Sequence, residues 1–352
     1  MPESATSRRK DAHLDLCATG DVAPAQNSTL LQCVRLVHCA MPELAAADVD
    51  LSLSWFGKTL RAPLVVTGMT GGSARAGNVN RDLAQAAEAA GVAFGVGSQR
   101  AMHEDAALTS SFAVRDVAPT VVLVGNVGLL QARAMGVDNV RRLADTIAAD
   151  GMALHLNPAQ EMNQPEGDRD FREGYATVEA LARAFGNRLL VKETGCGLSP
   201  QVARRLMECG VSQLDVSGLG GTSWVRVEEL RSEGAAREVG AQFADWGIPT
   251  AAAVALVRRA VGPHVTLIAS GGLRTGLDVA KAMALGANLG GMALPFFRAQ
   301  QAAGVEGVKS AIDVVLASLR QTLLLCGAKS QAQLHAGPKV ITGELKDWLT
   351  TV

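Results

Sequence analysis

The 352-residue sequence has few aromatic residues, almost no net charge and no long apolar run. It has one tyrosine, and aromatic residues make up 4% of the chain, so we expect a core of Ala, Val and Leu. The net charge of −1 excludes a global basic field that would attract nucleic acid or an anionic membrane surface. No apolar run reaches the roughly 18 residues of a membrane span. We therefore expect a cytoplasmic protein that binds neither nucleic acid nor membranes.

The six cysteines lack the spacing of a metal site or of a disulfide framework. No Cys-x-x-Cys pair occurs, and none of the cysteines stands at a zinc-like distance from a histidine. Cys196, in the run Thr-Gly-Cys-Gly, lies near a predicted strand end and could act as a nucleophile. The alternative, a small residue in a crowded turn, is favoured.

Short apolar runs alternate with Ala-rich helical segments along most of the chain, which predicts parallel strands joined by crossover helices. Eight strand-like runs in about 230 residues favour an α/β fold of the closed TIM (β/α)₈ type over an open sheet. They are residues 62–67, 92–97, 120–125, 152–156, 188–193, 212–216, 264–269 and 289–293.

The chain is predicted to form one domain in three parts: an N-terminal arm and cap (1–61), the barrel (62–325) and a C-terminal tail (326–352). A hairpin over Asp50–Leu60 is expected to cap the bottom of the barrel, and residues 305–325 to form a long helix. Two long insertions, a polar loop over 157–174 and the region 223–248, are expected to lie over the C-terminal face as lids.

The stretch after the seventh predicted strand carries the clearest binding signal. Gly271-Gly272 ends that strand with Arg274 beside it, and a second pair, Gly290-Gly291, lies in the eighth strand. Glycines at a strand's C-terminal end let backbone N–H groups approach a phosphate closely. The alternative is a tight turn without a ligand, but two such turns in succession favour a phosphate.

Polar residues and glycines stand at the other strand ends, where the active site of such a barrel lies. His155 alone could be an ordinary inner-face histidine, and Lys192 could pair with Glu193 or Glu161. Together, the strand-end residues point to a shared site, because an empty barrel needs none of them. They include Thr67, Gly68, Met69, Ser98, Gln99, Arg100, Asn126, His155, Asn157, Gln160, Glu161, Lys192, Ser217 and Thr222.

The residue types suit a flavin and an anionic substrate. Lys192, Asn126 and Ser98 are donors for a flavin's pyrimidine edge, where negative charge develops on reduction, and Gly68-Met69 would lie against the ring. A ribityl phosphate would be held by Ser217, Thr222, Gly271, Gly272, Leu273, Arg274, Ala293 and Leu294. Arg9, Lys10 and Arg100 would bind an anionic substrate, and Glu161 is a hard-oxygen ligand for Mg²⁺ bridging a diphosphate.

The sequence lacks the catalytic residues of two kinds of oxidoreductase that are built on this barrel. Flavin enzymes that oxidise 2-hydroxy acids need a histidine base after the sixth strand, where this chain reads Ser-Gly-Leu-Gly-Gly-Thr-Ser-Trp. Purine dehydrogenases need a reactive cysteine in a loop near the sixth strand, and Cys209 precedes that strand. The site therefore has the features of a flavin site without a dehydrogenase's equipment.

The chain resembles the type 2, FMN-dependent isopentenyl diphosphate isomerases. Matching motifs span nearly its whole length, at residues 9–13, 38–43, 69–72, 97–100, 155–161, 164–168, 191–193, 217–224 and 271–274. The resemblance implies interconversion of isopentenyl and dimethylallyl diphosphate by allylic proton addition and removal on reduced FMN, without net redox change. It also implies Mg²⁺, NADPH as the external reductant, and a homo-oligomer, a tetramer or octamer.

On the family's pattern, FMN contacts the flavin-site residues given above, and Glu161 binds Mg²⁺. The substrate contacts Arg9, Lys10, Ser98, Gln99, Arg100, His155, Asn157 and Gln160. Gln160, His155 and Asn157 are the expected catalytic residues, with acid–base work at the flavin N5 region and Gln160 relaying or positioning, since a neutral amide is a poor base. Glu228 is a further candidate carboxylate near the metal. Two alternatives remain open: an FMN oxidoreductase acting on a small anion, and a non-catalytic phosphate-binding barrel.

Overall fold

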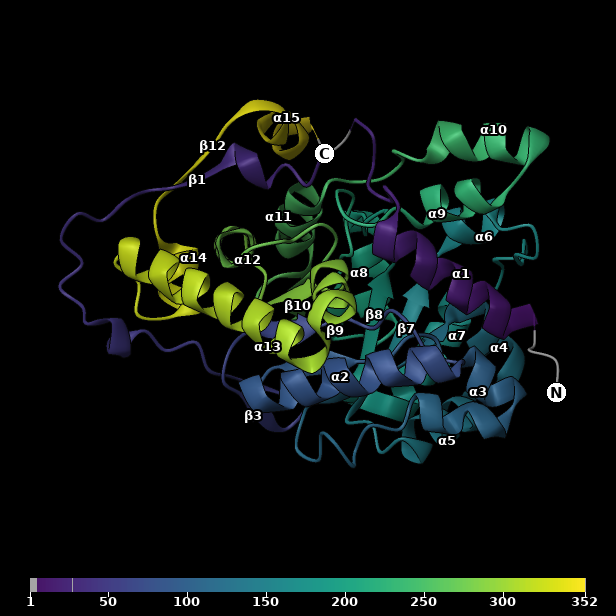
Figure 1. Ribbon diagram of the computed structural model, residues 1–352. Helices are drawn as coiled ribbons and strands as arrows, with labels where there is room; N and C mark the ends of the chain where they lie inside the picture. Colours follow the sequence, from purple (N-terminus) through teal and green to yellow (C-terminus); the bar gives the residue numbers. More distant parts are fainter. Residues whose placement is uncertain (1–4, 27, 352) are drawn as a thin grey trace.

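Eight short parallel strands close into a ring, with helices packed around its outside (Figure 1). The structure is a computed structural model that describes residues 5–26 and 28–351, with the side chains of residues 5–9 outside the description. The ring runs in the order β10-β11-β4-β5-β6-β7-β8-β9, and β9 pairs with β10 to close it. The predicted (β/α)₈ barrel is confirmed, and so are its eight strands. These are β4 (Leu64–Val66), β5 (Ala93–Gly95), β6 (Leu123–Gly128), β7 (Gly151–Leu156), β8 (Leu189–Glu193), β9 (Gln213–Asp215), β10 (Thr266–Ala269) and β11 (Leu289–Met292).

The strands bury both of their faces, which is why they read as continuous apolar runs rather than as alternating ones. Val65, Val124, Leu190 and Ile268 belong to the cluster that fills the barrel interior. Their neighbours along the strands, such as Val191, pack against the surrounding helices in a second, larger cluster. The core is aliphatic, as the composition predicts.

Helices follow the strands around the barrel, as the alternation of apolar runs and helical segments predicts. They are α2 (Ala74–Ala90), α3 (Arg100–Glu104), α4 (Leu129–Met135), α5 (Val137–Thr146), α7 (Gly174–Phe185), α8 (Pro200–Glu208), α11 (Thr250–Val261), α12 (Gly276–Ala284) and α13 (Leu294–Leu325). The long helix predicted over 305–325 is the second part of α13, which departs from helical geometry at Ala303 and Gly304.

The predicted hairpin is present and closes the bottom of the barrel. It consists of β2 (Leu53–Trp55) and β3 (Lys58–Leu60), which pair antiparallel. Trp55 belongs to the cluster inside the barrel, and its Nε1 donates to Gln213 Oε1 at 3.1 Å. Lys58 Nζ donates to Asp150 Oδ2 at 2.9 Å. The opposite, C-terminal end of the barrel is therefore the end at which a ligand can enter.

The two ends of the chain meet in a small sheet. β1 (Val34–Leu36) pairs antiparallel with β12 (Lys339–Ile341), although some 300 residues separate them. Residues 326–352, expected as a tail, also hold α14 (Gln331–Ala336) and α15 (Gly343–Thr351). The N-terminal helix α1 (Ala5–Thr19) lies across the barrel beside α2 and α13 (Figure 1).

The two insertions carry short helices on the C-terminal side of the barrel. The segment 157–174, expected as a polar loop, begins with α6 (Pro158–Asn163), and the region 223–248 forms α9 (Trp224–Arg231) and α10 (Gly234–Phe243). α6 packs against α9 and α10, and the three gather at one corner of the molecule (Figure 1). In the described part of the chain, none of the helices combines the length and apolar character that crossing a membrane requires.

Candidate functional site

A cavity at the carboxyl ends of β8–β11 and β4 forms the first part of the site, which we call the glycine lobe. It contains about 700 Å³ of empty space. All of the predicted cofactor residues except Ser98 and Asn126 line it. The lining consists of Thr67, Gly68, Met69, Lys192, Thr194, Gly195, Ser217, Gly221, Thr222, Trp224, Ser270, Gly271, Gly272, Leu273, Arg274, Gly291, Met292, Ala293, Leu294 and Pro295.

The backbone turns of this lobe pack too closely for side chains. Gly271 and Gly272 have φ values of +93° and +84°, a conformation that favours glycine. A Cβ on Gly272 would lie 2.5 Å from Thr29 Cγ2 and closer still to the Gly220 carbonyl. The loops after β9 and β10 therefore stack backbone on backbone, with Arg274 beside them. Close backbone approach next to a cationic side chain fits a phosphate group.

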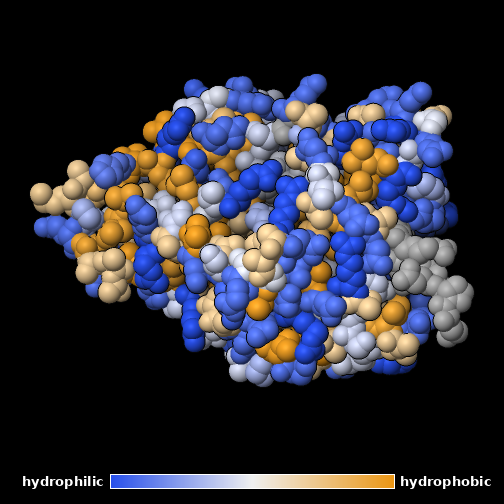
Figure 2. Space-filling model, in the orientation of Figure 1, coloured by the Kyte–Doolittle hydropathy of each residue, from blue (hydrophilic) through white to orange (hydrophobic). Residues whose placement is uncertain are grey.

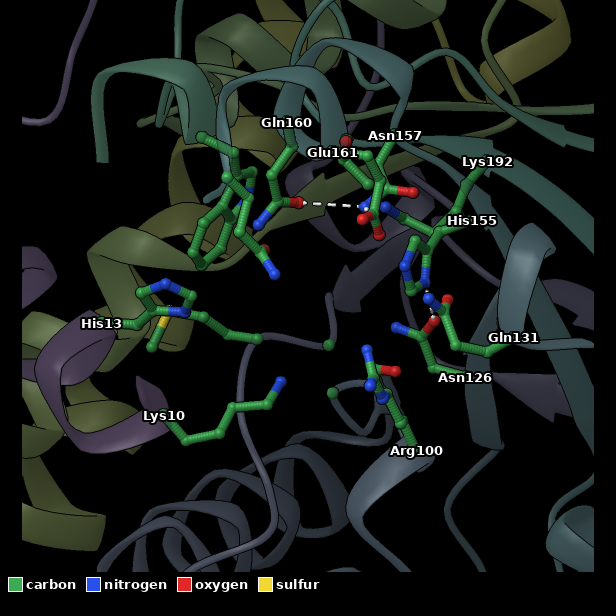
Figure 3. A pocket seen from close by; sticks show the side chains of 17 residues that line it. Lys10, His13, Arg100, Asn126, Gln131, His155, Asn157, Gln160, Glu161 and Lys192 are labelled. Carbon is green, nitrogen blue, oxygen red and sulfur yellow. Dashed lines mark hydrogen bonds between the residues drawn. The ribbon is translucent and has the colours of Figure 1, made fainter. Parts of the chain in front are cut away.

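A second cavity, the amide lobe, adjoins the first, and Figure 3 shows the side chains that line it. The two lobes share Gly68, Met69, Lys192, Thr194 and Trp224, so they form one continuous site. Lys10 and Arg100 lie on one side of the amide lobe, opposite Asn157 and Gln160 (Figure 3). Its remaining lining consists of His13, Gly97, Ser98, Asn126, Gln131, His155, Glu161 and Gln164.

A chain of hydrogen bonds runs along the amide lobe. Asn157 Nδ2 donates to Gln160 Oε1 at 3.3 Å and to Glu161 Oε1 at 3.1 Å. Gln160 Nε2 donates to Glu228 Oε1 at 3.2 Å, and His13 Nε2 lies 3.1 Å from the same oxygen. Gln160 is therefore held between an amide donor and a fully buried carboxylate. This arrangement fixes both ends of its amide group.

Both histidines of the amide lobe favour the neutral form. Burial lowers the pKa of His155 to about 3, and the charges of Lys192 and Lys10 add to the effect. Its Nδ1 lies 2.8 Å from Asn126 Oδ1, which accepts a hydrogen bond from an Nδ1–H tautomer. Burial likewise lowers the pKa of His13, although Glu228 opposes the shift. The lobe therefore places uncharged imidazoles beside its lysine and arginine side chains, and in this tautomer His155 Nε2 is a hydrogen-bond acceptor.

The model of the FMN-dependent dehydrogenase family matches residues 120–341. An isopentenyl-diphosphate delta-isomerase of Xanthobacter autotrophicus is 43% identical to the chain, over 96% of this chain and 97% of the relative. The isomerase of Thermococcus onnurineus is 41% identical over 99% of this chain and 94% of its own.

The chain belongs to the isopentenyl-diphosphate delta-isomerase family, of the FMN-dependent kind. Among solved structures, mandelate oxidases have a similar fold. One holding a monooxide FMN adduct has a TM-score of 0.65 and 19% identity, over 93% of this chain and 95% of that one. At this identity the likeness shows the fold alone.

Two of the residues expected to contact the substrate are not seen in the site. The Gln99 side chain is fully buried and turns away from the amide lobe, where its Nε2 donates to the Leu143 carbonyl at 3.0 Å. Its Oε1 accepts from the backbone N–H of Asn126 at 2.9 Å. The Gln99 side chain therefore supports the strand ends, and a contact between Gln99 and the substrate stays a prediction. The Arg9 side chain lies outside the described residues.

The structure also adds residues that the strand-end pattern did not select for this isomerase. His13 and Trp224 approach each other from α1 and α9, with ring centroids 5.2 Å apart. Both residues lie within the motifs by which the sequence resembles the family, at residues 9–13 and 217–224. Those motifs were the sequence signal that could have identified them as site residues. The wall also includes Gln131 on α4, Gln164 directly after α6 and Thr194 directly after β8.

The acidic residues near the site differ in exposure and partners. Glu161 faces the amide lobe, and its Oε2 accepts from the backbone N–H of Asp168 at 3.0 Å. Glu228, a candidate carboxylate in the sequence, lies behind Gln160 with Arg231 as an ion-pair partner. Within residues 5–26 and 28–351 no cluster of three or more His, Cys, Asp or Glu is arranged for a metal ion. A cation at Glu161 would need further ligands from a bound substrate.

Cys196 is unsuited to nucleophilic chemistry. Burial raises the pKa of its thiol to about 12, and the neighbouring Glu193 carboxylate adds to the shift. Its backbone carbonyl accepts from Ile248, so the residue serves the turn between two loops. This agrees with the interpretation of a small residue in a crowded turn.

Proposed function

We propose that this protein interconverts isopentenyl and dimethylallyl diphosphate, with FMN in the glycine lobe and the substrate in the amide lobe. The observation that carries the proposal is the continuity of the two lobes, which share a wall of Gly68, Met69, Lys192, Thr194 and Trp224. The membership of the family supports the substrate assignment. A substrate in the amide lobe would thus lie directly against the cofactor.

Reduced FMN, when bound, supplies an electron-rich ring face and acid–base capacity for allylic proton transfer without net redox change. The glycine turns and Arg274 would hold its phosphate, and Lys192, Asn126 and Ser98 would donate to its ring. These residues fit the group because the glycine turns expose backbone beside Arg274, because Lys192 lies on the wall shared by the two lobes, and because Ser98 and Asn126 line the adjoining amide lobe.

The protein's own residues would bind, orient and shield the substrate. Lys10 and Arg100 line the side of the amide lobe away from Gln160 and would hold the diphosphate (Figure 3). Gln160 would orient the alkene end, since its amide is fixed by Asn157 and Glu228. Neutral His155, whose Nδ1–H donates to Asn126, adds an acceptor at Nε2 without a competing charge. Trp224 would exclude water, which favours carbocation-like charge at the reacting carbons.

Glu161 would bind Mg²⁺ as part of the same proposal. Mg²⁺ in proteins is often held by one or two carboxylates together with substrate phosphates and water. Glu161 is 5% exposed, faces the amide lobe and is oriented by hydrogen bonds from Asn157 and Asp168. A single oriented carboxylate suits a metal that completes its shell with the diphosphate. NADPH is proposed as the external reductant that prepares the flavin.

A second candidate, oxidation or reduction of a small anion by FMN, draws on the family match and on the fold shared with mandelate oxidases. The loop after β9, residues 217–224, contains no histidine to act as the base. The two histidines of the amide lobe belong to α1 and β7. The isomerase therefore remains the better-supported function.

One anaerobic assay tests both candidates. The purified protein is given FMN, Mg²⁺, a small amount of NADPH and isopentenyl diphosphate, and the alkene products and NADPH are measured. Many turnovers of dimethylallyl diphosphate per NADPH consumed are expected for the isomerase. NADPH loss in proportion to product would identify a reductase, and a protein that binds no FMN would contradict both.

We also propose a homo-oligomer, a tetramer or octamer, in the cytoplasm. Apolar side chains gather at the end of the molecule built from β1, β12 and the C-terminal part of α13, on the left in Figure 2. Val37, Met41, Leu325 and Val340 are exposed. All six cysteines are free thiols, the state that a reducing compartment maintains. Light scattering after size exclusion measures the assembly, and a monomeric mass would contradict it.

A further inference from the structure

A buried carboxylate lies at the base of the glycine lobe and has no part in the proposed reaction. Asp215 is the last residue of β9 and is 1% exposed. Its neighbours in the strand register are Lys192 on β8 and Ile268 on β10. All three line the small hollow inside the barrel, below the glycine lobe. Asp215 therefore points inward, beneath the residues that would contact the flavin.

Asp215 Oδ1 joins the two loops that form the phosphate turns. It accepts a hydrogen bond from Ser270 Oγ at 2.7 Å and one from the backbone N–H of Ser217 at 3.1 Å. Ser270 immediately precedes Gly271, and Ser217 opens the loop after β9. The loops are joined again above this point, where the Gly218 N–H donates to the Ser270 carbonyl at 2.9 Å.

Ser217 needs such support because its backbone is strained. Its φ of +37° lies in the left-handed region, which a residue with a side chain adopts only when its surroundings hold it there. Burial of a carboxylate is also costly unless hydrogen bonds and an opposite charge compensate for it. Here two donors and the neighbouring Lys192 offset part of that cost, although burial still raises the pKa of Asp215. A carboxylate buried at this cost indicates that Asp215 has a specific role in holding the two loops.

We propose that Asp215 is a positioning residue that presets the phosphate turns and so sets the preference of this protein for FMN over riboflavin. The inference rests on the proposed function, because it assumes that the glycine lobe holds a flavin phosphate. Riboflavin shares the ring and the ribityl chain of FMN but lacks the phosphate. The ratio of the two dissociation constants therefore isolates the turns from the contacts to the ring.

Flavin fluorescence titrations of the full-length apoprotein measure both constants for the wild type and for Asp215→Ala, Asp215→Asn and Ser270→Ala. Asp215→Ala is expected to lower the riboflavin-to-FMN ratio at least tenfold, because both turn contacts are lost. Asp215→Asn keeps an oxygen acceptor and is expected to keep the ratio within about threefold of the wild type. Loss of the negative charge near Lys192 can change the binding of the flavin ring, but it changes both dissociation constants alike and so leaves their ratio unaffected. Circular dichroism verifies that each variant is folded.

An unchanged ratio in folded Asp215→Ala would overturn the inference and leave the proposed function intact. An equal loss in Asp215→Asn and Asp215→Ala would also overturn it, because the charge rather than the acceptor would then be responsible. If Asp215→Ala does not fold, Ser270→Ala decides, with at least a threefold fall expected and no change contradicting the inference. A wild-type protein that binds neither flavin would overturn the proposed function together with this one.

Discussion

Replacing Gly272 by alanine tests whether the close-packed turns of the glycine lobe are required for cofactor binding. Gly272 has a φ of +84°, and a left-handed backbone costs an L-residue about 1–2 kcal/mol. The added Cβ would also lie 2.5 Å from Thr29 Cγ2 and nearer to the Gly220 backbone, and overpacking of this kind costs about 1–3 kcal/mol. Gly272→Ala should therefore lower the free energy of unfolding by about 2–5 kcal/mol.

Gly57 provides a matched control in the β2–β3 hairpin at the opposite end of the barrel. Its φ is +76°, and a Cβ there would have no atom within 4 Å. Gly57→Ala therefore carries the backbone cost alone, about 1–2 kcal/mol. The difference between the two variants, about 1–3 kcal/mol, isolates the contact between the loops after β9 and β10.

Urea unfolding of the apoproteins gives the two stabilities, and flavin fluorescence gives the affinity for FMN. Gly272→Ala should weaken FMN binding at least tenfold, because the turn must shift to relieve the overlap. Gly57→Ala should bind FMN like the wild type. The reasoning is refuted if Gly272→Ala and Gly57→Ala have the same free energy of unfolding and Gly272→Ala retains the FMN affinity of the wild type. The turns would then be free to separate.

Other substitutions separate the roles of the two lobes. Lys192→Met should weaken FMN binding at least tenfold in fluorescence titration, and unchanged affinity would remove Lys192 from the cofactor residues. Glu161→Gln should raise the Mg²⁺ concentration needed for half-maximal turnover, and an unaltered metal titration would contradict its role. Gln160→Ala should lower turnover about a hundredfold while the protein stays yellow, in the range typical of lost acid–base or positioning groups. His155→Gln should make the stability of the protein less sensitive to acid. The pKa of His155 is about 3 in the folded state and 6.5 in the unfolded state, so the unfolded state takes up the proton first as the pH falls. The wild type should therefore lose stability between about pH 6.5 and 3, and the variant should lose less. Urea midpoints at pH 5 and 7.5 measure this, and identical pH profiles for variant and wild type would contradict it.

The barrel was predictable because its signals are local. The strands are or contain short apolar runs such as Leu64–Val66, and helices follow within a short stretch of sequence. Parallel strands bring their carboxyl ends to one face, so residues as distant as Thr67 and Arg274 could be assigned to one site. The glycine turns were likewise visible in the sequence, because only glycine satisfies their backbone geometry.

The sequence does not determine the direction of individual side chains or the contacts between segments that are distant in the chain. Gln99 stands next to Ser98, which lines the amide lobe, yet its side chain turns into the core to bond Leu143 and Asn126. No local pattern distinguishes these two orientations. The pairing of β1 with β12 joins segments from opposite ends of the chain, and neither strand exceeds three residues. The burial of Glu228 against His13 and Gln160 similarly depends on three elements meeting.

The loop after β9 limits the reactions that this barrel can support. An oxidation of a 2-hydroxy acid on this fold needs a histidine base there. A Cβ on Gly218 would lie 2.5 Å from Thr250 Cα, and one on Gly220 would lie 2.5 Å from Thr29 Cγ2. Both contacts are with groups that cannot move without displacing α11 or the N-terminal arm. The same packing that forms the phosphate turn therefore leaves no room for a base at these positions, so Gly218→His should destabilise the fold rather than confer oxidase activity. A folded Gly218→His protein that oxidises mandelate would contradict this argument, and thermal unfolding together with an oxygen-consumption assay distinguishes the two outcomes.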